Sequence, residues 1–185
     1  MDDRCSRRIQ IIGGPGTGKT TLARQVAAHL KAPCYELDEI GYEGGAGAAR
    51  LLEVRLADVR QVVVQPAWVS EGIFLGWTGE LFEAAGRIVW LDLPWKIVGW
   101  RIFMRHVRAE LRGNNKHSGW LKLYRFLQWS RMYYVQAANL QDMEPEGDLV
   151  ENRATTEAYL TKFQDKLVRC SNPAEVNAYL KSVRD

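Results

Sequence analysis

The chain has 185 residues, of which 46% are hydrophobic and 25% are charged, and its formal net charge is +3. These values are typical of one globular domain with a sizeable core, so we expect a single domain over residues 1–185. The charge is too small by itself to indicate a nucleic-acid-binding protein. The three cysteines lie far apart without metal-ligand spacing, which predicts reduced thiols. No run has the length of a membrane span and the first residues do not resemble a signal peptide, so we expect a cytoplasmic protein without a membrane partner.

The most informative stretch reads G-x-x-x-x-G-K-T, from Gly13 to Thr20. A β-branched run at residues 8–12 precedes it and helical spacing at residues 19–30 follows it, which is the context that a phosphate-binding loop requires. Lys19 is expected to reach the β- and γ-phosphates of a nucleotide, and the Thr20 hydroxyl to bind Mg²⁺. The backbone N–H groups of the loop and the positive end of the helix dipole are expected to bind the phosphates as well. The residues expected to hold the nucleotide are Gly14, Gly16, Thr17, Gly18, Lys19, Thr20 and Thr21.

Strands and helices are predicted to alternate along the rest of the chain. Further strands are expected at residues 34–37, 68–70, 87–92 and 166–170. Further helices are expected at residues 48–64, 78–85, 95–111, 120–138, 155–164 and 174–183, and residues 171–173 are expected to cap the last helix. Residues 41–47, 113–119 and 141–152 are expected to be loops. Helices of this length between strands have to cross a sheet face, which predicts a parallel sheet in an α/β fold.

Three of the predicted strands end at a carboxylate, and the ends of parallel strands meet at one edge of a sheet. Asp92 follows a nearly all-apolar strand and is expected to hold Mg²⁺, although a turn former before a proline fits the position equally well. Asp38 is expected to accept a proton from the phosphate acceptor, with a helix cap as the alternative. Glu71 and Gly72 are expected to contact that acceptor, with a surface charge as the alternative for Glu71. Whether Asp38 or Glu71 is the base stays open.

Three arginines on the predicted helix at residues 95–111, and Arg112 just after it, follow one another at steps of four, three and four. In a helix that extends to Arg112 they share one face. We interpret residues 101–138 as a helical lid whose arginines neutralise charge on the transferred phosphate. Arg105 and Arg108 are expected to be catalytic, and Arg112 is expected to contact the nucleotide. Arg101 lies nearer the start of the helix and is a weaker candidate. A solvated basic face is the alternative, and a basic face open to a polyanion would instead indicate a nucleic-acid partner.

Together, the phosphate loop, residues 35–38, 68–72 and 88–94 and the arginine helix resemble the P-loop kinases related to adenylate kinase, and most of all the topology-modulation or FlaR-like group. The resemblance implies a three-layer P-loop NTPase fold with a five-stranded parallel sheet in the order 2-3-1-4-5 and a helical lid. It also implies that ATP binds with Mg²⁺ and that Asn172 and Pro173 line the adenine. The arginines that it assigns to the lid are Arg105, Arg108 and Arg112.

The function expected from these features is transfer of the γ-phosphate of ATP to a small acceptor, such as a nucleoside, a nucleotide or a similar hydroxyl or phosphate compound. The alternative is a nucleotide-binding regulatory protein with weak hydrolysis, in which Asp38 and Glu71 would have no role. A nucleic-acid partner is disfavoured if the arginines turn inward as a lid. The partners expected are a nucleotide and the acceptor, and the chain is expected to be a monomer or a homodimer.

Overall fold

The computed structural model describes residues 7–112, 119–138 and 151–184. Within these ranges the strands are β1 (Arg8–Gly13), β2 (Cys34–Glu36), β3 (Trp68–Gly72), β4 (Arg87–Leu91) and β5 (Leu167–Cys170). The helices are α1 (Lys19–Leu30), α2 (Leu37–Gly41), α3 (Leu52–Val63), α4 (Gly79–Ala84), α5 (Trp95–Leu111), α6 (Trp120–Val135), α7 (Arg153–Leu160) and α8 (Pro173–Arg184). Two short 3-10 helices, η2 (Glu43–Gly45) and η3 (Thr161–Phe163), complete the described elements.

The five strands form one parallel sheet in the order β2-β3-β1-β4-β5. This confirms the expected fold class and the expected strand order. Strand β1 lies at the centre, between β3 and β4, and its residues from Ile9 to Gly13 are buried. A strand that is covered on both faces favours a continuous apolar run such as Ile9 to Ile12, in which Gln10 is the one polar residue. The loop that leaves β1 therefore starts from the middle of the sheet edge.

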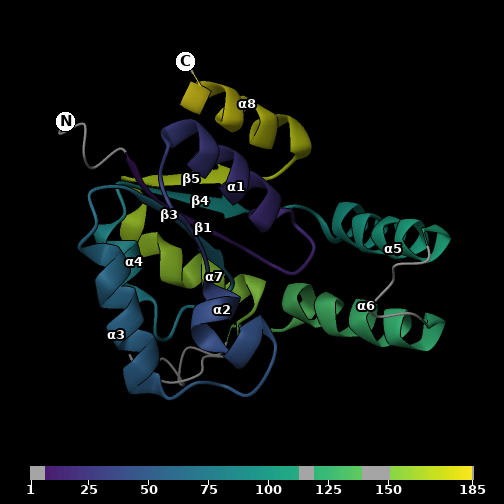
Figure 1. Cartoon of the computed structure of the whole chain (residues 1–185). Coiled ribbons are helices and arrows are strands. Elements are labelled where there is room, and N and C mark those ends of the chain that lie inside the picture. Colours follow the sequence, from purple (N-terminus) through teal and green to yellow (C-terminus); the bar gives the residue numbers. More distant parts are fainter. Residues whose placement is uncertain (1–6, 113–118, 139–150, 185) are drawn as a thin grey trace.

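Helices cover both faces of the sheet, which gives the three layers visible in Figure 1. One face packs on α1 and α8 through a core that includes Val26 and Tyr179. The other face packs on α2, α3, α4 and α7 through a larger aromatic core that includes Trp68, Phe82 and Tyr159. Burying these two apolar faces is the main driving force for the fold.

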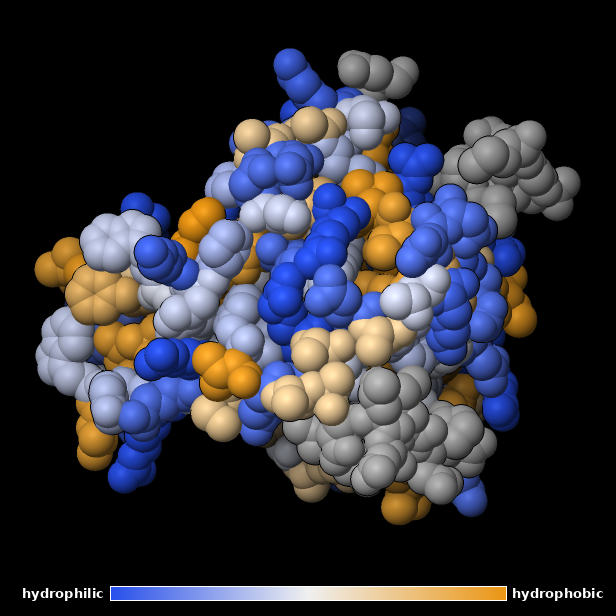
Figure 2. All heavy atoms as spheres, turned by 180° about the vertical axis from the view of Figure 1, so that it is seen from behind, coloured by the Kyte–Doolittle hydropathy of each residue, from blue (hydrophilic) through white to orange (hydrophobic). Residues whose placement is uncertain are grey.

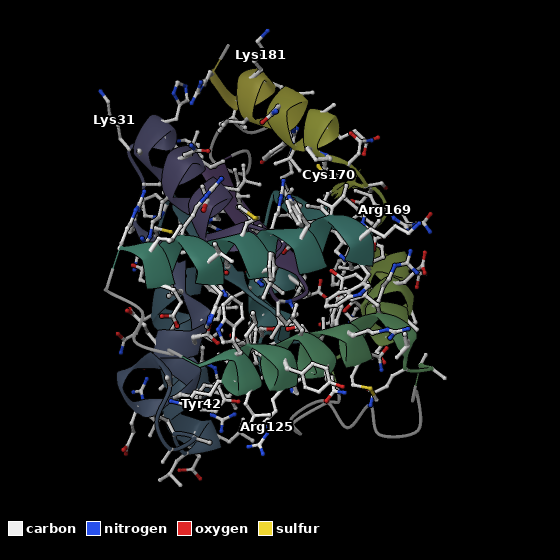
Figure 3. All side chains as sticks on the ribbon, turned by 90° about the vertical axis from the view of Figure 1, so that its right-hand side faces the viewer. Lys31, Tyr42, Arg125, Arg169, Cys170 and Lys181 are labelled. Atoms are coloured by element: carbon white, nitrogen blue, oxygen red, sulfur yellow. The ribbon has the colours of Figure 1, made fainter. Side chains whose placement is uncertain are left out.

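Helices α5 and α6 form a hairpin that projects from one end of the sheet (Figure 1). A small core between the two helices joins Leu93, Val98 and Ile102 to Leu123 near the start of α6. In Figure 2, where the hairpin lies on the left, hydrophobic side chains are exposed beside strongly hydrophilic ones on its surface. Figure 3 shows both helices crossing in front of the sheet, with Arg125 extending from α6 away from α5. No helix among the described residues is long and apolar enough to cross a membrane.

The structure corrects two predicted boundaries around β2. Strand β2 ends at Glu36, and Asp38 lies in the first turn of the short helix α2 rather than at a strand end. Helix α3 begins at Leu52, four residues later than expected, because the preceding residues are held in an extended conformation. There the Arg50 side chain donates to Ile40 O at 2.9 Å and the Arg50 N–H donates to Gly41 O at 2.9 Å.

Two of the predicted loops fall largely outside the described residues, which omit 113–118 and 139–150. The end of the second loop is described. There Asn152 caps α7, because its Oδ1 accepts from Thr155 N at 2.8 Å. The predicted helix at residues 155–164 corresponds to α7 followed by η3.

Candidate active site

The phosphate loop runs from Gly13 to Gly18 and leads directly into α1. Gly16 and Gly18 have φ values of 76° and 100°, a region that glycine enters at little cost. The carbonyl oxygen of Gly14 accepts from Thr17 Oγ1 at 2.9 Å and from Lys19 Nζ at 3.1 Å. These bonds hold the loop in a defined shape and keep the Lys19 ammonium beside it.

Carboxylates of neighbouring elements meet the phosphate loop at Lys19 and Thr20. Glu71 is the next-to-last residue of β3, is only 3% exposed, and accepts from Thr20 Oγ1 at 2.6 Å. Its neighbour in register on β2 is Glu36. Asp38 is exposed at the start of α2, where a ligand can reach it, and acts electrostatically on both Lys19 and Glu71. Two of the predicted carboxylates, Asp38 and Glu71, are thus brought together with the loop lysine.

The electrostatics of this cluster are set mainly by the removal of water. Burial lowers the pKa of the Lys19 ammonium, and the Glu71 and Asp38 carboxylates partly oppose that change. Desolvation raises the pKa of the Asp38 carboxyl, which the Lys19 charge partly offsets. Burial also raises the pKa of Glu71, against the effects of Lys19 and of the hydrogen bond from Thr20. Each of the three groups favours its neutral form more than it would in water. The charge of a bound ligand can therefore change the protonation state of each group.

Arginines of α5 reach the phosphate loop from its open side. Arg101 Nη1 donates to Thr17 O at 2.8 Å. Arg101 and Arg105 line a cavity of about 240 Å³ against the loop, together with Gly16, Gly18, Lys19, Thr20, Thr21 and Ile102. Arg105 thus lies beside the phosphate loop, and its catalytic role stays a prediction. Arg101, which sequence reasoning placed nearer the root of the helix, is a loop contact that it missed.

The two outer arginines of the same helix lie away from the loop. Arg108 and Arg112 line a groove of about 470 Å³ along α5, which also includes Trp100, Met104 and Ala109. Arg101 and Arg105 border this groove as well as the cavity at the loop, so the two spaces adjoin. Neither Arg108 nor Arg112 pairs with an acid of the described residues. Their contact with a nucleotide stays a prediction that requires the hairpin to close.

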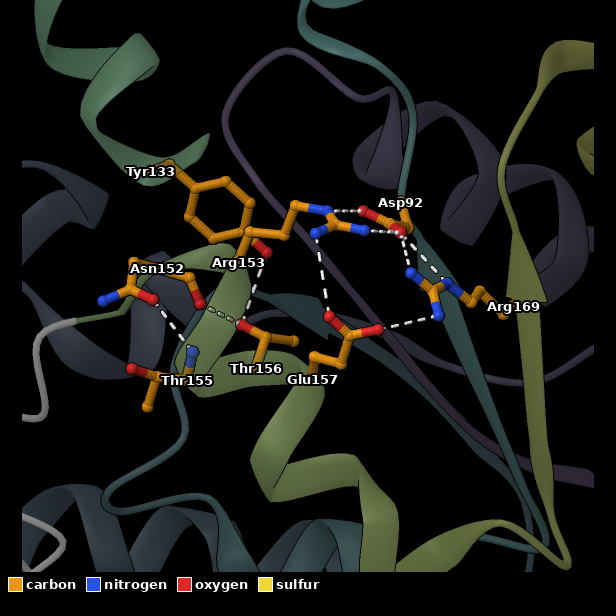
Figure 4. A network of polar contacts seen from close by, with 8 residues as sticks. All are labelled: Asp92, Tyr133, Asn152, Arg153, Thr155, Thr156, Glu157 and Arg169. Carbon is orange, nitrogen blue, oxygen red and sulfur yellow. Dashed lines mark hydrogen bonds and ion pairs between the residues drawn. The ribbon is translucent and has the colours of Figure 1, made fainter. Parts of the chain in front are cut away.

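Asp92 does not support the expected role as a metal ligand. Its oxygens accept from Arg153 Nε and Nη2 at 2.7 and 2.9 Å, and from Arg169 Nη2 and Nε at 2.6 and 3.0 Å. Both guanidinium groups also lie over the ring of Trp90, and Glu157 pairs with both (Figure 4). These four hydrogen bonds place two guanidinium cations around the Asp92 carboxylate, and their positive charge disfavours a metal ion there. Asp92 therefore joins β4 to α7 and β5.

Asn172 and Pro173, which the resemblance assigns to the adenine, lie at the start of α8, and that assignment stays a prediction. Asn172 Oδ1 accepts from Glu175 N at 3.0 Å, and its Nδ2 donates to Glu175 Oε1 at 2.7 Å. Asn172 therefore caps the N-terminus of α8, in which Pro173 is the first helical residue. Gly72 is likewise explained by packing, since a Cβ there would lie 2.8 Å from Leu37 Cβ.

Oxygen ligands that suit Mg²⁺ are present at one place in the cluster. Thr20 and Glu71 present a hydroxyl and a carboxylate side by side at the buried end of the loop. Mg²⁺ is commonly held by one or two such side chains together with substrate phosphates. Within the described ranges no group of three histidine, cysteine or acidic side chains could hold a metal ion without such help. The residues present therefore fit a magnesium ion that arrives with a nucleotide.

Comparison with known proteins gives one family model, the ATPase family associated with various cellular activities (AAA), which matches residues 9–65. No curated protein matches the chain. A gluconokinase from Sinorhizobium meliloti 1021 has a TM-score of 0.49 at 17% identity, covering 98% of this chain and 95% of that chain. A shikimate kinase from Acinetobacter baumannii in complex with shikimate has a TM-score of 0.49 at 15% identity, covering 95% and 90%. A shikimate kinase from Aquifex aeolicus has a TM-score of 0.48 at 14% identity, covering 95% of each chain.

Proposed function

We propose that the protein is an ATP-dependent phosphotransferase that moves the γ-phosphate of ATP to a small-molecule acceptor. The observation that supports this most directly is the cluster in which Lys19, Glu71 and Asp38 act on one another beside the phosphate loop. A loop that merely joined a strand to a helix would not require two carboxylates and a desolvated lysine at one point. A binding protein without transfer would not require Asp38 at an exposed position beside that lysine.

The roles follow from the side chains and their positions. The loop N–H groups and the start of α1 bind the phosphates, and Lys19 supplies a positive charge to the β- and γ-phosphates. Thr20 and Glu71 hold Mg²⁺, which when bound neutralises phosphate charge and orients the phosphate chain. Arg101 and Arg105 contact the phosphates from α5, where they stabilise the charge that develops during transfer. Arg108 contributes when the hairpin moves closer to the loop.

Asp38 acts as the base in this proposal. Its carboxylate accepts the proton of an acceptor hydroxyl while that oxygen bonds to the γ-phosphorus and the bond to the bridging oxygen of ADP breaks. The raised pKa of Asp38 suits the task, because a more basic carboxylate takes up a proton more readily. Glu71 is less suited to this role, because its carboxylate is buried and already accepts from Thr20.

Among P-loop proteins, we place the chain with the kinases related to adenylate kinase and nearest to their topology-modulation or FlaR-like group. The strand order, the strand-end carboxylate Glu71 and the arginines of α5 support that placement. The acceptors compatible with it include nucleosides, nucleotides and small hydroxylated acids.

The decisive experiment measures ADP release from Mg²⁺-ATP over a panel of nucleosides, nucleotides, sugars and sugar acids. One acceptor is expected to stimulate turnover. Asp38→Asn should then lower the rate by about 10²- to 10⁴-fold while ATP affinity changes by less than about twofold. Glu39→Gln, an exposed neighbour in the same short helix, is the matched control and should retain the rate. Full activity in Asp38→Asn would remove it as the base, and slow hydrolysis that no acceptor stimulates would instead support a regulatory protein.

A further inference from the structure

The α-carbon of Gly14 in the phosphate loop lies against the ring of Tyr133 from α6. A Cβ added to Gly14 would stand 2.6 Å from Tyr133 Cδ1 and 2.7 Å from Cε1. Gly14 is not among the glycines with a positive φ, so its backbone conformation is open to other residues. The requirement for glycine at this position therefore comes from the aromatic ring and not from the turn.

Tyr133 is fixed at both ends of its side chain. Its ring is 5% exposed, and its hydroxyl donates to Thr156 Oγ1 at 3.3 Å. Thr156 Oγ1 in turn donates to Asn152 O at 2.8 Å, and Asn152 Nδ2 donates to Ala137 O at 3.2 Å, just beyond α6. Figure 4 shows the contacts of Tyr133, Thr156 and Asn152. Burial raises the pKa of Tyr133 to about 12, so the hydroxyl keeps its proton and remains a donor.

The Gly14 peptide carries this constraint to the lysine of the loop. Its carbonyl oxygen is the acceptor for Lys19 Nζ and for Thr17 Oγ1. A displacement of Gly14 would move that acceptor and release both donors. Helix α5 contacts the loop in a similar way, because a Cβ at Gly16 would stand 2.7 Å from Ile102 Cγ1. Both helices of the hairpin therefore rest on the phosphate loop, α5 at Gly16 and α6 at Gly14.

We propose that Tyr133 is a positioning residue for the phosphate loop, which holds the Gly14 peptide in place and thereby sets where Lys19 meets a nucleotide. The proposal rests on the proposed function in one respect, namely that the loop binds ATP. Through this contact the affinity for ATP depends on how the root of the α5–α6 hairpin sits against the sheet. Tyr133 acts through Gly14 and does not itself touch the phosphates.

A double-mutant cycle between Gly14→Ala and Tyr133→Ala tests the contact, with the Kd of Mg²⁺-ATP from calorimetry as the readout. Each single variant should weaken binding by about tenfold or more. The coupling between the two changes should then be about fivefold or more, within the range measured for residues in direct contact. In the Tyr133→Ala background, Gly14→Ala should add less than about twofold, because the ring that it would strike is gone. Tyr133→Phe keeps the ring and should bind ATP within about twofold of the wild-type chain.

The control separates positioning from general loss of stability. Tyr179→Ala removes the same side chain from an equally buried site on α8, where it should lower Tm without changing the Kd for ATP. Tyr133→Leu, which keeps apolar volume, replaces Tyr133→Ala in the cycle if the alanine variant does not fold. Equal costs of Gly14→Ala in both backgrounds, or unchanged ATP binding in Tyr133→Ala, would overturn the proposal.

The same experiment distinguishes this inference from the proposed function, because its readout is ATP binding and not transfer. A wild-type chain that binds ATP but phosphorylates no acceptor would refute the phosphotransferase proposal, and the cycle would still decide the role of Tyr133. A wild-type chain that transfers phosphate, with additive effects of the two variants, would refute the positioning role alone.

Discussion

Replacing Asp92 with asparagine should reduce stability rather than metal binding. The Asp92 side chain is 5% exposed and pairs with Arg153 and Arg169, whose side chains are 36% and 39% exposed. Removing one partner of a fully buried ion pair costs about 3–5 kcal/mol. Because water reaches both arginines, we expect a smaller loss, of about 2–4 kcal/mol. In a domain of this size that corresponds to a fall in Tm of roughly 4–16 °C.

The assay pairs thermal unfolding with a Mg²⁺ titration of ATP turnover. Asp92→Asn should unfold at a lower temperature and show the same half-saturating Mg²⁺ concentration as the wild-type chain. Glu157→Gln is the matched control, because Glu157 pairs with the same two arginines but is 45% exposed. Its loss should be below about 1 kcal/mol. An unchanged Tm together with a raised Mg²⁺ requirement in Asp92→Asn would refute this reasoning and return Asp92 to the metal site.

Three further predictions follow from the site. Burial raises the pKa of Glu71 in the folded chain, so its ionisation destabilises the fold as pH rises through that pKa. Glu71→Gln should therefore raise Tm at pH 8 but not near pH 3, where the carboxyl is protonated in both the folded and the unfolded chain. An equal gain at both pH values would contradict this. Arg105→Ala should lower kcat by about 10²-fold, more than it weakens ATP binding. Arg125→Ala, on the outer side of α6, is the control and should leave kcat and ATP binding unchanged. Equal rates in the two variants would remove Arg105 from the site. Asn172→Ala should lower the free energy of unfolding by about 1 kcal/mol, because the cap of α8 is lost, and should leave the Kd for ATP unchanged. Weaker ATP binding at an unchanged Tm would instead support a contact between Asn172 and the adenine.

The first unit of the fold was predictable because all of its signals are local. The β-branched run, the glycines and the helical spacing lie within residues 8–30, and α1 has the predicted bounds Lys19–Leu30. The order of the strands is a different matter. It depends on pairings such as Gln10 with Ser70, whose side chains are hydrogen-bonded 60 positions apart. That order was available only through the resemblance to a known family, which implied it correctly.

The roles of Asp92 and Arg101 were harder to predict because their partners are distant in sequence. Arg153 and Arg169 lie 61 and 77 positions from Asp92, and no spacing rule connects them. Arg101 contacts Thr17 across 84 positions, although its place on the same helix face as Arg105 was a usable signal. The cap formed by Asn172 was readable, since an acidic residue stands three positions later. The sequence analysis did expect that cap, beside the adenine contact that the family resemblance implied.

The central place of β1 has a consequence for how the chain acquires its nucleotide site. The strand that carries the phosphate loop is synthesised well before both of its neighbours in the sheet, β3 and β4. Contacts between distant segments form slowly, since a large loop must close before they stabilise anything. On a ribosome, the loop should therefore acquire its final shape only after Leu91 has emerged. A nascent chain stalled before that point should retain no ATP.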